Sequence, residues 1–218
     1  ILSQVVKPVT CRHEKHLLSK PARLQISIDE AVEMLRRGGV VAFPTDTLYG
    51  LGADAFREDA IKRVFEIKGR PSKMALPLLL GRTRDLDLVA VDIPDSAWSL
   101  AERFWPGPLT LILKSAPKIP AIVTADGTTV AVRVPNHPVP LQLTQRLRQP
   151  ITGTSANITG GPDPRTAEDV KRALGDKVDY IIEQSLGQSA ATLGTPSTVL
   201  DLTGATPRLT RQGAIPLD

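Results

Sequence analysis

The chain has 218 residues, of which 41% are hydrophobic and 23% are charged, so it can bury one sizeable core and is neither disordered nor fibrous. Its net charge of +4 is mildly basic, and aromatic residues make up only 4%, which argues against a surface that stacks many bases of single-stranded nucleic acid. The longest apolar runs fall far short of the roughly 20 residues that a membrane helix requires, no signal peptide is visible, and the one cysteine, Cys11, cannot form an internal disulfide. We therefore expect a cytoplasmic protein that does not bind membranes.

The start of the chain predicts an arm followed by a helix. Residues 1–25 have few strand signals and predict an N-terminal arm or an added edge element, and residues 26–218 predict one folded domain. Ser27 and Glu30 have the spacing of a capping box, in which a serine side chain caps a free N–H while a glutamate reaches back. This pattern predicts a helix that begins at Ser27, and Gly38-Gly39 predict its end.

Short apolar runs alternate with helical patterns along the rest of the chain. The runs that predict strands are residues 40–43, 76–80, 109–113, 130–134, 180–182 and 198–202. The segments that predict helices are residues 59–68, 95–104, 139–148 and 166–174, the last with Thr166 and Asp169 at capping positions. This alternation predicts an α/β fold with an open twisted sheet and helices packed on it, and it does not separate a parallel sheet from a mixed one.

Basic residues concentrate in one segment. Residues 57–84 contain eight lysines and arginines against three acidic residues, and this excess of +5 exceeds the net charge of the whole chain. Such a cluster attracts polyanions, either the phosphates of a nucleotide or a nucleic-acid backbone, and it also arises when a helix presents one solvated face. The charge pattern alone leaves these interpretations open.

Several common catalytic patterns are missing from the sequence. There is no G-x-x-x-x-G-K-[ST] loop, so phosphates are not held by a P-loop helix. Residues 50–55 fit the loose dinucleotide pattern G-x-G-x-x-A, but Lys68 and Arg70 stand about 20 residues on, where a ribose-binding acid is expected. His137 is the one histidine beyond the arm, and no G-x-S-x-G motif accompanies it, so a nicotinamide enzyme and a histidine-based hydrolase are both disfavoured.

Metal ligands are also sparse. Cys11, His13 and His16 lie close together in the arm, but a structural zinc site requires four protein ligands and no second cluster supplies the rest. We therefore predict no metal site built by the protein alone, and we interpret these residues as part of an ordinary polar arm.

Small hydroxyl side chains and single basic residues recur at the ends of the predicted strands. The segments are P-T-D-T-L-Y-G-L-G (44–52), K-G-R-P (68–71), W-P-G-P-L-T (105–110), T-V-A-V-R-V-P (129–135), T-S-A-N (154–157), S-T-V (197–199) and R-Q-G (211–213). In open α/β sheets, ligands bind outside strand ends where several loops converge, and the planar fork of arginine suits phosphate and carboxylate. In this order the motifs resemble the YrdC/Sua5 family of threonylcarbamoyl-AMP synthases, and the match runs from about residue 28 to residue 214.

The resemblance implies a single-domain α/β fold, with a twisted open mixed sheet and packed helices around a deep basic cavity, and it makes residues 26–218 the catalytic domain. It implies a nucleotidyltransferase that forms L-threonylcarbamoyladenylate and pyrophosphate from L-threonine, bicarbonate and ATP for the t6A37 modification of tRNA. Mg²⁺ would accompany the ATP. A downstream tRNA threonylcarbamoyl transferase complex is the implied protein partner, and RNA is a further candidate.

Carried over position by position, the resemblance implies a role for nine polar residues. Lys68 and Arg70 are the implied catalytic cations that face the triphosphate. The implied ATP-binding residues are Lys68, Arg70, Thr129, Ser155, Asn157 and Arg211, and the implied threonine-binding residues are Thr47, Arg133 and Ser197. Because such a reaction forms no covalent enzyme intermediate, cations and oriented donors can supply most of its catalysis.

One departure from the family pattern and two alternatives remain. After K-G-R-P, many relatives continue with Asn-Pro-Leu and then a histidine that contacts the substrate, whereas Gly81 stands near that histidine position here. The first alternative is an RNA-binding module of the same fold, against which the few aromatic residues and the missing RNA-recognition motif weigh. The second is a carbamoyl-transfer enzyme that uses carbamoyl phosphate and forms carbamoyl-adenylate without threonine.

Overall fold

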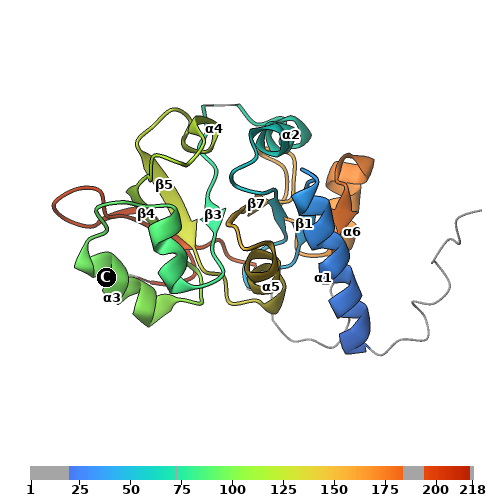
Figure 1. Ribbon diagram of the computed structural model, residues 1–218, viewed down its shortest axis with the longest axis horizontal. Coiled ribbons are helices and arrows are strands. Elements are labelled where there is room, and N and C mark those ends of the chain that lie inside the picture. The colour runs from blue at the N-terminus through green and yellow to red at the C-terminus, as the bar shows by residue number, and fades with distance from the viewer. Residues whose placement is uncertain (1–19, 72, 184–193, 217–218) are drawn as a thin grey trace, which may run out of the picture.

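The computed structural model describes residues 20–71, 73–183 and 194–216 of the chain (Figure 1). Cys11, His13 and His16 lie outside these ranges, and the proposed division of the chain at residue 25 stays a prediction. Within the described ranges, no helix combines the length and the apolar character that crossing a membrane requires.

The smaller of two mixed sheets has four strands in the order β7-β2-β1-β8. Its strands are β1 (Val41–Phe43), β2 (Gly50–Gly52), β7 (Thr154–Ser155) and β8 (Tyr180–Ile181). Strand β1 pairs antiparallel with β2 and parallel with β8, and β2 pairs antiparallel with β7.

The larger sheet has six strands in the order β10-β9-β4-β5-β3-β6. Its strands are β3 (Leu78–Leu79), β4 (Leu109–Lys114), β5 (Thr129–Arg133), β6 (Ile151–Thr152), β9 (Thr198–Asp201) and β10 (Arg208–Arg211). The two sheets meet just beyond β2, where Asp54 bridges to Ile151 and the Thr152 amide donates to the Ala53 carbonyl at 2.8 Å. The predicted open mixed arrangement is therefore confirmed, with its strands divided between two sheets.

In the described part of the chain, six α-helices and two 3₁₀ helices pack around the sheets (Figure 1). The helices are α1 (Lys20–Arg36), α2 (Glu58–Lys68), α3 (Asp95–Phe104), α4 (Ala121–Thr124), α5 (Pro138–Leu147) and α6 (Ala167–Leu174), with η2 (Thr83–Leu88) and η3 (Gly175–Lys177). Apolar faces of α1 and α5 form a small core with Phe43 and Ile151, and the larger core includes buried residues of α2, α3, α4 and α6.

The predicted elements agree with the structure except at the first helix. Helix α1 begins at Lys20, so the prediction that Ser27 caps its start is wrong, and Ser27 lies inside the helix. Glu30 accepts a hydrogen bond from the Tyr180 hydroxyl at 2.5 Å, which ties α1 to β8.

The glycines of the loose dinucleotide pattern form strand β2 and no phosphate-binding turn. A Cβ on Gly52 would lie 2.5 Å from the Thr152 carbonyl oxygen and 2.9 Å from the Phe43 ring, so glycine is needed for close packing at the junction of the two sheets. Because β2 pairs antiparallel on both sides, it does not belong to the parallel βαβ unit that a dinucleotide site requires.

Candidate functional site

One cavity of about 320 Å³ is lined by residues from both sheets. The loop between β1 and β2 and strand β7 form one wall, and strands β4, β5 and β9 form the other. Six of the nine predicted site residues line it: Thr47, Arg70, Arg133, Ser155, Ser197 and Arg211. Lys68, Thr129 and Asn157 are not among the lining residues.

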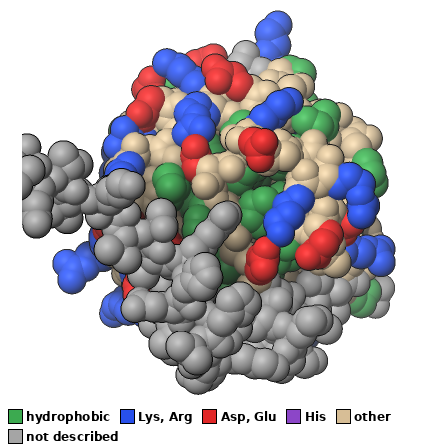
Figure 2. Space-filling view, turned by 90° about the vertical axis from the view of Figure 1, so that its right-hand side faces the viewer, with side chains coloured by type: hydrophobic (Ala, Val, Ile, Leu, Met, Phe, Trp, Pro, Cys, Tyr) green, Lys and Arg blue, Asp and Glu red, His purple; other side chains and the backbone are tan. Residues whose placement is uncertain are grey.

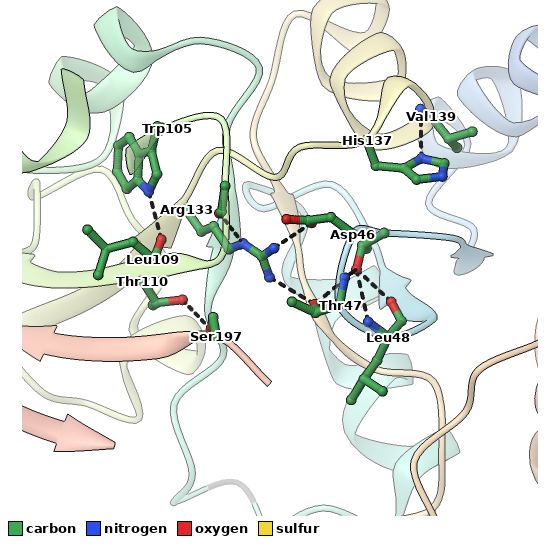
Figure 3. Close-up of polar contacts among 12 residues, drawn as sticks. Asp46, Thr47, Leu48, Trp105, Leu109, Thr110, Arg133, His137, Val139 and Ser197 are labelled. Atoms are coloured by element: carbon green, nitrogen blue, oxygen red, sulfur yellow. Dashed lines mark hydrogen bonds and ion pairs between the residues drawn. The ribbon is translucent and has the colours of Figure 1, made fainter. Parts of the chain in front are cut away.

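Arg133, at the end of β5, is a buried cation at the base of this site (Figure 3). Its Nε donates to the Gly107 carbonyl at 2.8 Å, its Nη1 donates to Thr47 Oγ1 at 3.0 Å, and its Nη2 forms an ion pair with Asp46. Burial lowers the pKa of Arg133 and the Asp46 carboxylate opposes that shift, so the guanidinium stays charged. Three of its five N–H groups are used in this way, which leaves two for a ligand.

The loop between β1 and β2 is shaped by its own hydroxyl groups. Thr45 Oγ1 donates to the Leu48 carbonyl at 2.6 Å and accepts from the amides of Thr47 and Leu48. The hydroxyl oxygens of Thr45 and Thr47 lie 3.1 Å apart, and Thr47 Oγ1 also accepts from Arg133 Nη1. Thr47 therefore faces the cavity with its oxygen oriented toward Arg133.

Ser197, Thr110 and Arg211 form a second polar group on the opposite wall. The parallel pairing of β4 with β9 brings the hydroxyls of Thr110 and Ser197 to 2.8 Å. Arg211 Nη2 donates to the Ser197 carbonyl at 2.8 Å and to its hydroxyl at 3.1 Å. Burial lowers the pKa of Arg211, and the charge of Asp163 acts in the opposite direction.

Arg70 enters the cavity from the loop that follows α2. Its Nε donates to the Met74 carbonyl at 3.3 Å and its Nη2 to the Ala75 carbonyl at 2.8 Å, so the side chain is held by its own loop. Burial lowers the pKa of Arg70. The three arginines Arg70, Arg133 and Arg211 make the cavity a site for anionic groups such as phosphate and carboxylate.

The predicted cation Lys68 is used inside the protein. Its ammonium donates to the carbonyls of Ser155 at 2.5 Å and Asn157 at 2.7 Å, and to Asn157 Oδ1 at 3.2 Å, while the residue is only 1% exposed. Burial and the nearby Arg70 lower the pKa of Lys68 to about 8. Thr129 begins β5 opposite Lys114, at the far end of the strand from Arg133.

Other cavity residues were not predicted as site residues. Among the described residues, Asp163 is the one carboxylate in the lining, and Thr45 and Thr110 add hydroxyl groups. Asp46 and Thr110 stand within the motifs quoted above, next to or near predicted residues, but the sequence does not tell which hydroxyls and carboxylates of a motif face a ligand.

Gly81 lies apart from this cavity. It lines a separate hollow of about 460 Å³ beside α5, and its carbonyl accepts from Gln145 Nε2 at 3.1 Å. A Cβ at this position would lie 2.8 Å from Thr144 Oγ1, so a larger side chain would require the Thr144 side chain to move.

His137 caps helix α5 instead of lining the cavity. Its Nδ1 accepts from the Val139 amide at 3.2 Å (Figure 3). Burial lowers the pKa of His137 to about 4, against the effect of Asp46, so the ring is neutral at pH 7. Within the described part of the chain, no three His, Cys, Asp or Glu side chains gather to hold a metal ion.

The two sheets and their cationic, hydroxyl-lined cavity define an α/β protein built to hold anionic small molecules. A model of the Sua5/YciO/YrdC family, described as "Telomere recombination", matches residues 33–213. The chain belongs to this family.

Two curated relatives share the name threonylcarbamoyl-AMP synthase. The chain is 44% identical over 188 residues to the threonylcarbamoyl-AMP synthase of Pyrococcus abyssi and 41% identical over 189 residues to that of Bacillus subtilis. Each alignment covers 86% of this chain and 54% of the relative, so the chain spans about half the length of these curated relatives. The crystal structure of P. abyssi Sua5 complexed with L-threonine matches with a TM-score of 0.83 and 43% identity, over 87% of this chain and 55% of that one.

Proposed function

We propose that this chain contains the catalytic domain of a cytoplasmic threonylcarbamoyl-AMP synthase, which converts ATP, L-threonine and bicarbonate into L-threonylcarbamoyladenylate and pyrophosphate. The observation that carries the proposal is the cavity of about 320 Å³, in which three arginines and several hydroxyl groups converge. Such a donor set suits a ligand pair with phosphate and carboxylate groups. The names of the two curated relatives, and the L-threonine bound in the P. abyssi Sua5 structure, support the same activity.

We assign the threonine substrate to the side of the cavity formed by Thr47, Arg133 and Ser197. Arg133 has two N–H groups left after its contacts with the protein, which is the number that one carboxylate accepts in a bidentate pair. Its fork is fixed by Asp46 and Thr47, so little side-chain freedom is lost when the substrate binds.

We assign the nucleotide to the side formed by Arg70, Ser155 and Arg211. In the reaction, the threonine amine and bicarbonate form a carbamate with loss of water, and a carbamate oxygen attacks the α-phosphorus while pyrophosphate leaves. Negative charge builds up on the phosphate oxygens, where fixed guanidinium groups stabilise it without rearrangement during the step. The cavity would also hold the carbamate and the ATP side by side, which lowers the entropic part of the activation barrier.

The Mg²⁺ that accompanies ATP finds at most one protein carboxylate in the cavity as the structure describes it. Asp163 is that carboxylate, and Mg²⁺ commonly binds through one or two carboxylates and the phosphates of its substrate. A single carboxylate fits an ion that arrives with the nucleotide. When bound, the ion would neutralise part of the charge on the leaving pyrophosphate.

The product would be consumed by a tRNA threonylcarbamoyl transferase complex that forms t6A37. An acyl-adenylate is a mixed anhydride that water can hydrolyse, so an acceptor enzyme must follow. Direct contact with RNA has less support, because Arg57, Lys62 and Arg63 of the basic segment pair with Asp59, Glu58 and Asp179. On the face turned toward the viewer in Figure 2, basic and acidic side chains also alternate.

Pyrophosphate release tests the proposal directly. The chain should release pyrophosphate from ATP only when threonine and bicarbonate are both present. Arg70→Ala and Ser155→Ala should each lower the rate by tens to hundreds of fold, which corresponds to about 2–4 kcal/mol of transition-state stabilisation. Arg84→Ala, an exposed residue of the same basic segment outside the cavity lining, is the matched control and should keep the full rate.

Two results would redirect the assignment to the alternatives. Turnover with carbamoyl phosphate and without threonine would identify a carbamoyl-transfer enzyme. RNA binding with a steep salt dependence and no nucleotide turnover would identify an RNA-binding module.

A further inference from the structure

We propose that Lys68 is a positioning residue, whose ammonium holds the turn at residues 155–157 and, through Asn157, the loop that carries Asp163, instead of contacting the phosphates of the nucleotide. The inference rests on the proposed function, and it gives Lys68 a different role from that of Arg70 two residues later.

The ammonium of Lys68 has no donor left for a phosphate. A protonated lysine has three N–H groups, and the structure provides three protein acceptors: the carbonyls of Ser155 and Asn157 and the side-chain oxygen of Asn157. The side chain is almost completely buried and lies outside the cavity lining. A phosphate contact would require breaking at least one of these bonds and leaving a buried carbonyl without a partner.

These contacts fix Ser155, whose hydroxyl lines the cavity. Asn157 Oδ1 accepts from Lys68 and also from Ser155 Oγ at 2.7 Å. Because a lysine ammonium can only donate, the oxygen of the Asn157 amide must face it, and the NH₂ group must point the other way. The direction of the Ser155 hydroxyl is thus set by Lys68 through Asn157.

The NH₂ group of Asn157, whose direction Lys68 fixes, also holds the loop that follows. It donates to the carbonyls of Gly161 at 2.8 Å and Pro162 at 3.0 Å, directly before Asp163. The loop is also tied to the last residue of α2, since the Thr159 amide donates to the Lys68 carbonyl at 2.9 Å. Lys68 therefore anchors two parts of the cavity wall.

Arg70 provides the contrast within the same motif. Its guanidinium lines the cavity and uses two of its five N–H groups on carbonyls of its own loop, which leaves three for phosphate oxygens. The two basic residues of K-G-R-P thus have different roles. Arg70 contacts the nucleotide, and Lys68 holds the part of the cavity wall against which the nucleotide binds.

Hydrogen exchange and nucleotide affinity test this assignment on the full chain. In Lys68→Met without ligand, we expect the Thr159 and Gly161 amides to exchange at least tenfold faster. Lys62→Met is the matched control, because Lys62 lies exposed on the same helix and pairs with Glu58 at 3.9 Å, and it should leave both rates unchanged. Calorimetry should show that Lys68→Met lowers the affinities for ATP and for AMP by the same factor. Arg70→Met removes a direct contact, so it should lower the affinity for ATP more than the affinity for AMP.

The assignment is overturned if Lys68→Met exchanges like the wild type and loses affinity for ATP at least tenfold more than for AMP. Should Lys68→Met fail to fold, Asn157→Asp decides, because it keeps an oxygen for Lys68 and removes the donors to Gly161 and Pro162. We expect at least tenfold faster exchange at Gly161 in that variant, and an unchanged rate would overturn the assignment. The exchange experiment needs no substrate, so its outcome is separate from a failure of the wild type to release pyrophosphate.

Discussion

Arg133 and Asp46 form a buried ion pair that joins the two sheets, since Arg133 ends β5 of the six-stranded sheet and Asp46 lies in the loop after β1 of the four-stranded sheet. Their side chains are 7% and 9% exposed. The pair also orients Thr47 through the second branch of the guanidinium. The cavity and the junction between the sheets therefore depend on the same charge.

Asp46→Asn should destabilise the fold by about 3 kcal/mol, because it leaves the buried Arg133 without its counter-ion. Among the described residues Asp46 Oδ2 has no hydrogen-bond partner, so an amide NH₂ placed there would be unsatisfied as well. Denaturant unfolding at pH 7 measures the effect. Asp92→Asn is the matched control, since Asp92 pairs with Lys114 on the surface, and it should change the free energy of unfolding very little. Equal effects of the two variants would contradict the prediction.

His137 should make the stability of the fold depend on pH. Its pKa in the folded protein is about 4, below the ordinary value of 6.5, so unfolded chains bind a proton at His137 where folded chains do not. The contribution to stability is complete above pH 6.5 and is lost as the pH falls toward 4, by about 3 kcal/mol in all.

The substitution His137→Asn isolates this effect from the protonation of carboxylates, because an asparagine side chain can cap α5 in the same way without titrating. The difference in unfolding free energy between the wild type and the variant should shift in favour of the variant by about 3 kcal/mol between pH 7 and pH 4. A difference that stays constant over this range would show that His137 is not buried in its neutral form.

Gly52→Ala should disrupt the junction between the sheets. The added Cβ would lie 2.5 Å from the Thr152 carbonyl oxygen, and a backbone atom cannot move away as the end of a flexible side chain can. We expect a loss of about 2–3 kcal/mol in unfolding free energy, as for other overpacked cores. Gly204→Ala, whose added Cβ would meet nothing closer than 3.8 Å, is the control and should leave stability nearly unchanged.

The strands that the sequence predicted are those with continuous apolar runs, such as β4 and β5, because a buried strand needs apolar side chains on both faces. Strand β2 has the sequence Gly-Leu-Gly, which does not predict a strand, since its glycines serve packing against Phe43 and carry no strand signal. Strands β6 and β7 have two residues each, too few for any period to appear.

The sequence predicts that basic and hydroxyl residues gather in the cavity. It does not predict which of their hydrogen-bond donors remain available to a ligand. The motifs around Thr47, Arg133 and Ser197 do converge, because each lies at or next to a strand end that borders the cavity. Thr129 and Arg133 stand at opposite ends of β5, where four residues of extended chain separate them by about 13 Å, and the role of Thr129 stays a prediction. A motif also does not tell whether the charge of a lysine is used inside the protein, as that of Lys68 is.

Asp163→Asn should strengthen the binding of ATP in the absence of Mg²⁺. Asp163 lines the cavity together with Arg211, and its negative charge opposes that of an incoming triphosphate. Removing one exposed charge near the phosphates should tighten binding about fivefold at low salt and less at high salt, because ions screen the interaction. Calorimetry with ATP and a chelator measures this change. Asp87→Asn, an exposed acid outside the cavity lining, should have no effect, and weaker ATP binding by Asp163→Asn would show that the carboxylate accepts a hydrogen bond from the nucleotide.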